Sequence, residues 1–119
     1  MMVPDIEAAR RYHHERAAER YRRREAERQQ WFRRACDVVV VLAPQYPAVR
    51  RVFLFGSLVK PGRFRPDSDI DVAVLCDDVA VESAFWQAVE QALGRTVDLR
   101  PLTGVLAEVV TQEGVRVYG

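Results

Sequence analysis

Residues 52–75 read VFLFGSLVKPGRFRPDSDIDVAVL, and this stretch decides the fold. It opens with Val52–Phe55, a wholly apolar run that stops at Gly56-Ser57, which is typical of a buried strand ending in a turn. Residues 60–68 contain two prolines and a glycine, so regular strand pairing is excluded there. Residues 70–75 form a second apolar run, broken by a single aspartate. The stretch therefore predicts two buried strands joined by a turn and a loop.

Two aspartates stand where the second strand begins. Asp69 and Asp71 flank Ile70, and alternation along a strand places both carboxylates on one face while Ile70 points to the core. Close carboxylates repel and raise one another's pKa, and a hard divalent cation is the commonest way to keep both ionised. Since Mg²⁺ prefers one or two carboxylates plus substrate phosphates, the pair predicts a site for Mg²⁺ and a nucleoside triphosphate.

The turn before the loop suits a phosphate. Gly56 lets backbone N–H groups approach closely, and the Ser57 hydroxyl can donate to a phosphate oxygen. Residues from Leu58 onward are expected to begin a short helix that adds positive potential and ends at Pro61-Gly62. A lone Gly-Ser or Asp-x-Asp is usually an ordinary solvated turn, but their order between two buried strands favours a functional site.

A third carboxylate is predicted at Asp98. Thr96–Arg100 alternates, with apolar side chains facing inward and Asp98 on the other side. The preceding segment, 81–93, has an apolar stripe at helical spacing and is followed by Gly94 in a C-cap position. A helix joining the two strands would bring all three carboxylates to one side of one sheet. The alternative, a solvated aspartate on a polar strand face, stays open.

Phe53–Ser57 followed by Pro66–Val74 resembles the signature of the DNA-polymerase-beta-like nucleotidyltransferase superfamily, and more narrowly that of the minimal nucleotidyltransferases. The resemblance runs from Phe53 to the C-terminus. We therefore expect an α/β (α+β) nucleotidyltransferase fold, with a mixed β-sheet, helices packed on one face, and a long charged helix at the N-terminus.

The resemblance also implies roles for the residues of the site. Gly56 and Ser57 would contact the nucleoside triphosphate, and two Mg²⁺ ions would be held by three carboxylates, Asp69, Asp71 and Asp98. Asp98 would help to lower the pKa of the attacking hydroxyl. Attack at the α-phosphorus would then transfer a nucleoside monophosphate and release pyrophosphate.

The loop departs from the family pattern in two ways. It places eleven residues, Leu58 to Ser68, between the Gly-Ser pair and the first aspartate, one more than is usual in the family. It also has Leu58 and Val59 where many relatives carry an arginine after the serine. The phosphates are therefore expected to be held by other polar side chains of this loop, namely Lys60, Arg63, Arg65 and Ser68.

The N-terminal third has a different composition. Residues 1–34 hold ten arginines and six acidic residues, whereas residues 35–119 carry eight basic and eleven acidic residues. Residues 5–33 lack glycine and proline and contain i,i+4 pairs such as Glu19 and Arg23, which predicts a long solvent-exposed helix. We divide the chain into this charged helix, 1–34, and a minimal nucleotidyltransferase domain, 35–119.

The basic helix admits more than one role. Arg22-Arg23-Arg24 beside Tyr21 suggests a nucleic-acid contact, but interleaved glutamates are more typical of a solvated face or of a dimer or partner arm. We do not expect direct nucleic-acid binding, and a homo-oligomer formed through this helix stays open. Apolar spacing over residues 35–42 predicts a second half-helix packed on the sheet, and residues 105–110 and 115–118 predict a last helix and strand.

Nothing before residue 30 resembles a signal peptide, and the longest apolar run, Val38–Ala43, is too short to cross a membrane. Cys36 and Cys76 are expected to be free thiols, and the protein is expected in the cytoplasm, away from membranes. A length of 119 residues allows one domain with one core, so the acceptor is expected to be supplied by another molecule.

Minimal nucleotidyltransferases of this size commonly pair with a small helical HEPN-type toxin, so the resemblance implies an antitoxin. The enzyme would transfer AMP from ATP onto a tyrosine hydroxyl of that toxin. Two alternatives stay open. One is a small-molecule (aminoglycoside-like) nucleotidyltransferase, and the other is a catalytically degenerate antitoxin that binds its partner stoichiometrically.

Overall fold

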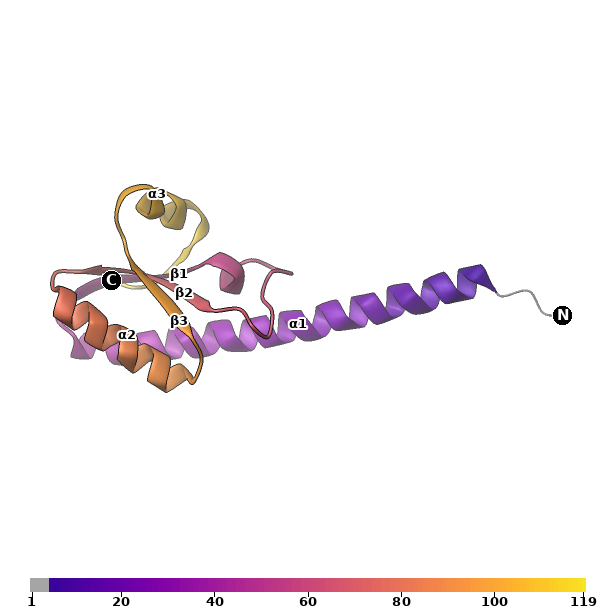
Figure 1. The fold of residues 1–119 in the computed structure, drawn as a ribbon, viewed down its shortest axis with the longest axis horizontal. Helices are drawn as coiled ribbons and strands as arrows, with labels where there is room; N and C mark the ends of the chain where they lie inside the picture. The colour runs from indigo at the N-terminus through magenta and orange to yellow at the C-terminus, as the bar shows by residue number, and fades with distance from the viewer. Residues whose placement is uncertain (1–4) are drawn as a thin grey trace.

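The computed structural model describes residues 5–119, which form helices, strands and short 3₁₀ turns (Figure 1). In chain order these are α1 (Ile6–Leu42), η1 (Ala43–Gln45), β1 (Val49–Phe55), η2 (Gly56–Val59), β2 (Ile70–Cys76), α2 (Val79–Leu93), β3 (Val97–Pro101), α3 (Gly104–Glu113) and β4 (Val115–Tyr118). The strands and helices predicted from residue 52 onward are all present. β1 begins at Val49 rather than Val52, and the short helix expected from Leu58 already begins at Gly56 as η2.

The strands form one mixed sheet in the order β3-β2-β1-β4. β1 runs antiparallel to both β2 and β4, and β2 runs parallel to β3. A parallel pair needs a crossover connection, and α2 supplies it. Asp78 caps α2 by accepting a hydrogen bond from the Val81 amide at 3.0 Å, and Gly94 ends it with φ 63°. The predicted α/β fold with a mixed sheet is confirmed.

The main core lies between the sheet and the helices α1 and α2. Alternate strand residues point into it without exposed surface, among them Val52, Leu54, Ile70 and Val72. α2 contributes Phe85 and Val89, which are also fully buried. The apolar stripe predicted over residues 81–93 is therefore the face that α2 packs against the sheet.

The expectation that helices pack on one face holds for α1 and α2 but not for α3. α3 packs on the opposite face, where Val110 and Leu106 contact Phe53 and Ala73, and Figure 1 shows it across the sheet from α1 and α2. The reason is that β1 and β2 carry apolar side chains on both faces near their middle. By alternation, Asp71 shares its face with Ala73 and hence with α3.

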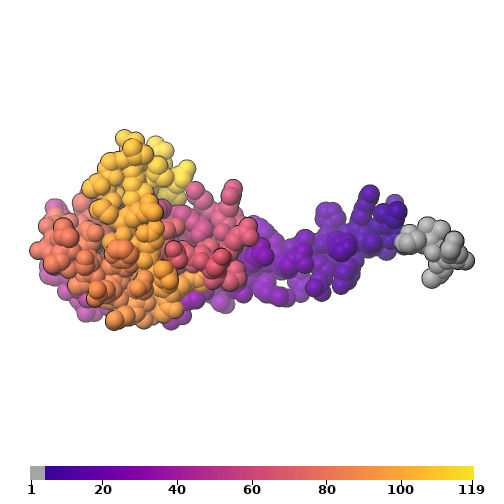
Figure 2. All heavy atoms as spheres, viewed as in Figure 1, coloured from indigo at the N-terminus to yellow at the C-terminus, as the bar shows by residue number. Residues whose placement is uncertain are grey.

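α1 is one helix that crosses residue 34 without a break. Its C-terminal part packs on the sheet through the buried Ala35 and Val39, so the predicted second half-helix is the continuation of the first. The N-terminal part projects into solvent and makes the molecule long, with extents of 74 × 28 × 18 Å (Figures 1 and 2). The predicted boundary between residues 34 and 35 therefore lies inside one helix, and Trp31 and Phe32 already pack against the core.

No helix within residues 5–119 is long and apolar enough to span a membrane. Cys36 and Cys76 are free thiols, as predicted, and both are half-buried. Burial raises the pKa of the Cys36 thiol, with a further contribution from Asp37, so this thiol is held in its protonated form.

Candidate functional site

The site forms at one end of the sheet, where three backbone segments meet. Asp71 of β2 and Asp98 of β3 are register partners in the parallel pair, so their side chains share a face. Phe55, the last residue of β1, pairs with Asp71, which brings the Gly56-Ser57 turn to the same end. Asp69 directly precedes β2 and is exposed, whereas Asp71 and Asp98 are half-buried. The structure therefore brings the predicted carboxylates and the Gly-Ser turn together.

Gly56 lies directly against the Asp71 carboxylate. A Cβ atom added at Gly56 would collide with Oδ2 of Asp71 and would lie 3.1 Å from its Cγ. The φ angle of Gly56 is +72°, a left-handed conformation that L side chains rarely adopt. Both observations require glycine at this position, and they explain why the turn follows the strand so tightly.

Negative charge is concentrated on this face. Burial, and next the charge of Asp98, raises the pKa of Asp71 above its ordinary value; Asp69 adds to the rise and Arg100 partly offsets it. Arg100 Nη2 donates to Asp98 Oδ2 at 3.1 Å. Asp69 and Asp71 form no ion pair with any residue that the structure describes. The net negative charge of these three aspartates therefore favours binding of a cation.

Positive charge lies beside the carboxylates, on the loop after β1. Gly56, Ser57, Lys60 and Arg63 line one open hollow of about 410 Å³, a size typical of small-molecule sites. Lys60 Nζ lies 3.3 Å from Oε2 of Glu113 on α3, in an exposed ion pair. Four of the residues predicted to bind the nucleotide are thus gathered in one place.

Arg65 and Ser68, the other two predicted nucleotide ligands, do not line this hollow. The Ser68 hydroxyl accepts a hydrogen bond from the Arg65 backbone amide at 2.9 Å, which closes the turn that leads into Asp69. Arg65 is exposed. In this arrangement Ser68 shapes the loop, and the guanidinium of Arg65 is left in solvent.

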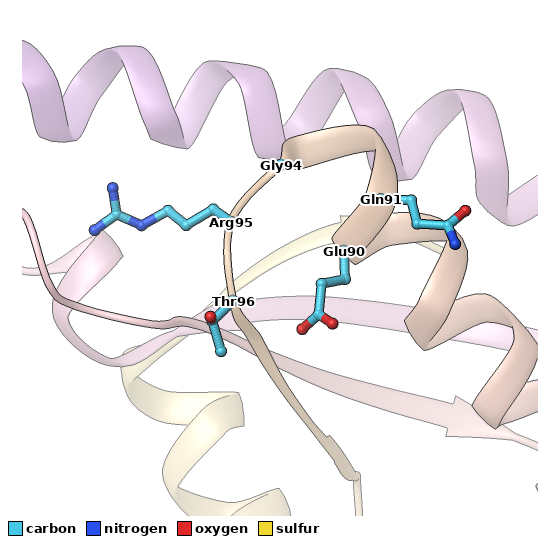
Figure 3. Close-up of a pocket in the computed structure, with 5 residues that line it drawn as sticks. All are labelled: Glu90, Gln91, Gly94, Arg95 and Thr96. Atoms are coloured by element: carbon cyan, nitrogen blue, oxygen red, sulfur yellow. The ribbon is translucent and has the colours of Figure 1, made fainter.

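Arg95 was not predicted from the sequence, yet it holds the turn of residues 65–68 that leads into Asp69. Its guanidinium lies 4.8 Å from the ring centre of Trp31 and 4.5 Å from that of Phe64. It also donates hydrogen bonds of 2.7 to 3.0 Å to the backbone carbonyls of residues 65, 66 and 68. Figure 3 shows Arg95 extending from the α2–β3 connection, away from Glu90. No local pattern marks this arginine, because its partners come from distant segments.

The carboxylates fit Mg²⁺ bound together with a nucleotide. Their oxygens are the hard ligands that Mg²⁺ prefers, and burial together with the neighbouring Asp98 raises the pKa of Asp71. Among residues 5–119, no three histidine, cysteine or acidic side chains are close enough together to hold an ion on their own. Asp69, Asp71 and Asp98 therefore do not form an all-protein cage, whereas Mg²⁺ usually takes only one or two carboxylates and completes its shell with phosphates and water.

A mixed sheet with a Gly-Ser turn at the end of β1 and carboxylates on β2 and β3 is the architecture of a nucleotidyltransferase domain. Residues 37–119 match the family described as Polymerase beta, Nucleotidyltransferase, and the chain belongs to this family. The superfamily predicted from the sequence is thereby confirmed.

A curated relative is the protein adenylyltransferase MntA of Shewanella oneidensis, which is 30% identical over 88 residues. These residues make up 69% of this chain and 63% of the relative, so the match spans less than two thirds of that protein. Two solved structures are also similar. One is a toxin-antitoxin complex with AMP-PNP, with 30% identity, a TM-score of 0.60 and coverage of 71% of this chain and 73% of that chain.

The other is a tri-AMPylated Shewanella oneidensis HEPN toxin in complex with MNT antitoxin. It shows 26% identity and a TM-score of 0.53, and covers 77% of this chain and 72% of that chain. Both structures have the fold that the sequence predicted here.

Proposed function

We propose that this chain is a Mg²⁺-dependent nucleotidyltransferase that transfers AMP from ATP to a tyrosine hydroxyl of a small helical HEPN-type toxin, and so acts as its antitoxin. The observation that carries the proposal is the pairing of Asp71 with Asp98, with Gly56 against the Asp71 carboxylate. The relatives support it: MntA is a protein adenylyltransferase, one complex holds AMP-PNP, and another holds an AMPylated HEPN toxin beside an MNT antitoxin.

The phosphates of ATP would bind over the hollow after β1. The backbone amides around Gly56 and the Ser57 hydroxyl donate to phosphate oxygens, and Lys60 and Arg63 neutralise their charge. Lys60 would leave its exposed ion pair with Glu113 and bind a phosphate instead. An exposed ion pair of this kind contributes little to stability, so breaking it costs little.

The transfer step joins the acceptor oxygen to the α-phosphorus and breaks the bond to the bridging oxygen of the leaving pyrophosphate. Mg²⁺ held by Asp69, Asp71 and Asp98 would supply charge stabilisation at the entering and leaving oxygens. Asp98 would accept the hydroxyl proton on Oδ1, because Arg100 donates a hydrogen bond to its Oδ2. Asp69 is exposed, so the acceptor reaches the site from solvent.

The N-terminal part of α1 is proposed as an arm that binds the partner. Arginines recur along it, and nearly every side chain from Asp5 to Arg24 is exposed. An isolated helix is marginal in water, so a partner surface would stabilise it. We therefore propose residues 1–34 as the charged partner-binding helix and residues 35–119 as the minimal nucleotidyltransferase domain. The free thiols Cys36 and Cys76 fit a reducing compartment, and we place the reaction in the cytoplasm.

The proposal is tested by intact-mass spectrometry. The chain is incubated with Mg²⁺, each of the four nucleoside triphosphates and the product of the neighbouring gene, next to an Asp69→Asn/Asp71→Asn control. We expect the partner to gain the mass of one or more adenylyl groups with ATP, and the control to show no gain. Peptide mapping of the modified partner then tests whether the acceptor is a tyrosine.

A second candidate function is stoichiometric inhibition without catalysis. It is favoured by the loop 58–68, which is one residue longer than is usual in the family. The same experiment separates the two functions. A stable complex without mass gain on either protein, and unchanged toxin neutralisation by Asp69→Asn/Asp71→Asn, would overturn the catalytic proposal in favour of this one.

A further inference from the structure

Two charged residues of α1 are packed against the nucleotide loop, by which we mean residues 56–63. The side chains of Glu25 and Arg28 retain 16% and 12% of their exposed surface, although every other residue from Ala9 to Gln30 is exposed. Charged side chains on a protruding helix are rarely buried unless they are paired. Their burial therefore indicates a specific contact with the body of the protein.

The two side chains form one unit that holds the loop at two points. Arg28 Nε and Nη2 donate to the Glu25 carboxylate at 3.0 and 2.8 Å. Arg28 Nη1 donates to the backbone carbonyl of Leu58 at 3.0 Å, and Glu25 Oε1 accepts from the backbone amide of Gly62 at 2.7 Å. One contact fixes the loop where it leaves the fully buried Leu58, and the other fixes its tip.

The same face of α1 reaches from the loop to the core. Tyr21, Glu25 and Arg28 follow one another at i, i+4 and i+7, and Phe32 and Ala35 continue this stripe into the packed C-terminal part of the helix. The Tyr21 ring lies against the loop tip, since a Cβ added at Gly62 would be 3.3 Å from its Cε2. Figure 1 shows the segment between η2 and β2 descending to α1. The helix thus fixes the loop relative to the sheet.

The pair differs from the other ion pair on this helix. Hydrogen bonds from Arg28 and the Gly62 amide hold the pKa of Glu25 below its ordinary value, so the carboxylate is ionised at neutral pH. Glu19 and Arg23, by contrast, are 3.6 Å apart with side chains 59% and 69% exposed, and such pairs contribute little. A bidentate, partly buried pair has the geometry that restricts a loop.

We propose that Glu25 and Arg28 are positioning residues for nucleotide binding, which hold Ser57, Lys60 and Arg63 in the arrangement that receives the triphosphate. This role rests on the proposed function, because it assumes that the loop binds nucleotide. It makes α1 part of the nucleotide site in addition to the proposed partner arm.

The test uses a charge-swapped variant of the full chain, Glu25→Arg/Arg28→Glu. This variant keeps an i,i+3 ion pair on the helix, but an arginine at 25 cannot accept from the Gly62 amide and a glutamate at 28 cannot donate to the Leu58 carbonyl. The matched control is Glu19→Arg/Arg23→Glu, which swaps the exposed pair on the same helix. Glu25→Gln is the conservative variant, since its side-chain oxygen still accepts from Gly62. Circular dichroism and thermal unfolding verify that each variant folds.

Hydrogen exchange without nucleotide is the first readout. Peptides covering residues 58–63 should exchange about tenfold faster in the charge-swapped variant than in the wild type, because two anchoring hydrogen bonds are lost. Calorimetric titration with AMP-PNP and Mg²⁺ is the second, and the dissociation constant should rise about tenfold. In AMP transfer, KM for ATP should rise more than kcat falls. Glu25→Gln should give values between those of the wild type and the charge-swapped variant. The control swap should match the wild type in hydrogen exchange and in AMP-PNP affinity, the two readouts that do not involve the partner.

The outcomes separate this role from the proposed function. Unchanged exchange and unchanged affinity in the charge-swapped variant would overturn the positioning role while leaving the nucleotidyltransferase intact. Faster exchange with unchanged affinity would also overturn it, because the loop would then be held without consequence for the nucleotide. If the wild type binds no nucleotide and the loop nevertheless exchanges faster in the charge-swapped variant, the proposed function is overturned. Glu25 and Arg28 would then have only a structural role in holding the loop.

Discussion

Asp71 and Asp98 face each other across the parallel pair of β2 and β3, on the face of the sheet that α3 also covers. Two carboxylates in register on neighbouring strands destabilise a fold unless something positive joins them. Arg100 offsets Asp98 through a hydrogen bond of 3.1 Å, but Asp71 has no such partner among the residues described. The pairing therefore costs stability in the free protein, which is typical of a functional site.

Asp71→Asn should stabilise the protein while abolishing the proposed AMP transfer. The fold raises the pKa of Asp71, so ionising this carboxyl at pH 7 weakens the folded state relative to the unfolded chain. Removing the charge should raise the melting temperature by roughly 2–5 °C, measured by circular dichroism at pH 7. The gain should vanish in acid, where Asp71 is protonated in both states. Asp67→Asn, an exposed neighbour, serves as control, and a lower melting temperature for Asp71→Asn would contradict the prediction.

Gly56→Ala should be far more damaging than Gly94→Ala, although both glycines have positive φ angles, +72° and +63°. Nothing lies within 4 Å of a Cβ added at Gly94, so that variant should lose only about 1 kcal/mol, the cost of the left-handed backbone. At Gly56 the new methyl would also displace the Asp71 carboxylate, which should bring the loss to about 3 kcal/mol. Urea unfolding measures both values, and equal losses would show that the contact with Asp71 does not matter.

Arg95→Lys should loosen the loop before Asp69. Lysine keeps the charge but lacks the planar fork that stacks between Trp31 and Phe64 and donates to several carbonyls at once. We expect a loss of roughly 2 kcal/mol in the free energy of unfolding. Faster hydrogen exchange should be confined to residues 63–69. Arg33→Lys, on an exposed part of α1, is the matched control, and a similar loss there would point to a general effect of arginine content.

Glu25 should make the stability of the protein depend on pH. Its pKa is lowered by the hydrogen bonds from Arg28 and Gly62, so its contribution is fully present above the unfolded pKa and is lost as the pH falls through the folded pKa. The wild type should be about 1 kcal/mol more stable than Glu25→Gln at pH 7. The difference should shrink as the pH falls below the ordinary pKa of a glutamate and through the lowered pKa of Glu25. Urea unfolding at several pH values checks this, and a constant difference would contradict it.

Much of the fold could be predicted because the signals are local. The apolar run that ends at Gly56 and the run that follows Asp69 predicted β1 and β2, and the stripe closed by Gly94 predicted α2. Asp71 and Asp98 were expected to lie together, and the register of the sheet places them so. These inferences needed only the periods of strands and helices and the direction of each chain segment.

Other features depended on contacts that no local pattern records. α3 packs on the second face of the sheet, where it covers the apolar side chains of Phe53 and Ala73, whereas the fold expected from the resemblance had its helices on one face. The predicted loop residues divide between a hollow lined by Lys60 and Arg63 and a turn closed by Ser68. Arg95 and the pair Glu25 and Arg28 acquire their roles from partners about 30 residues away.

The sequence by itself determined the order of the strands along the chain, the turn at Gly56-Ser57 and the positions of the three aspartates that we propose as the metal ligands. These depend on residue type and spacing, which act over a few neighbouring positions. Only the tertiary structure decided that α1 is one helix and that its Glu25 and Arg28 hydrogen-bond to the loop at residues 62 and 58. It also decided that Arg95 donates to the backbone of the turn before Asp69. Such contacts follow from how the packed elements are placed, because a side chain finds its partners only when the core has fixed both backbones.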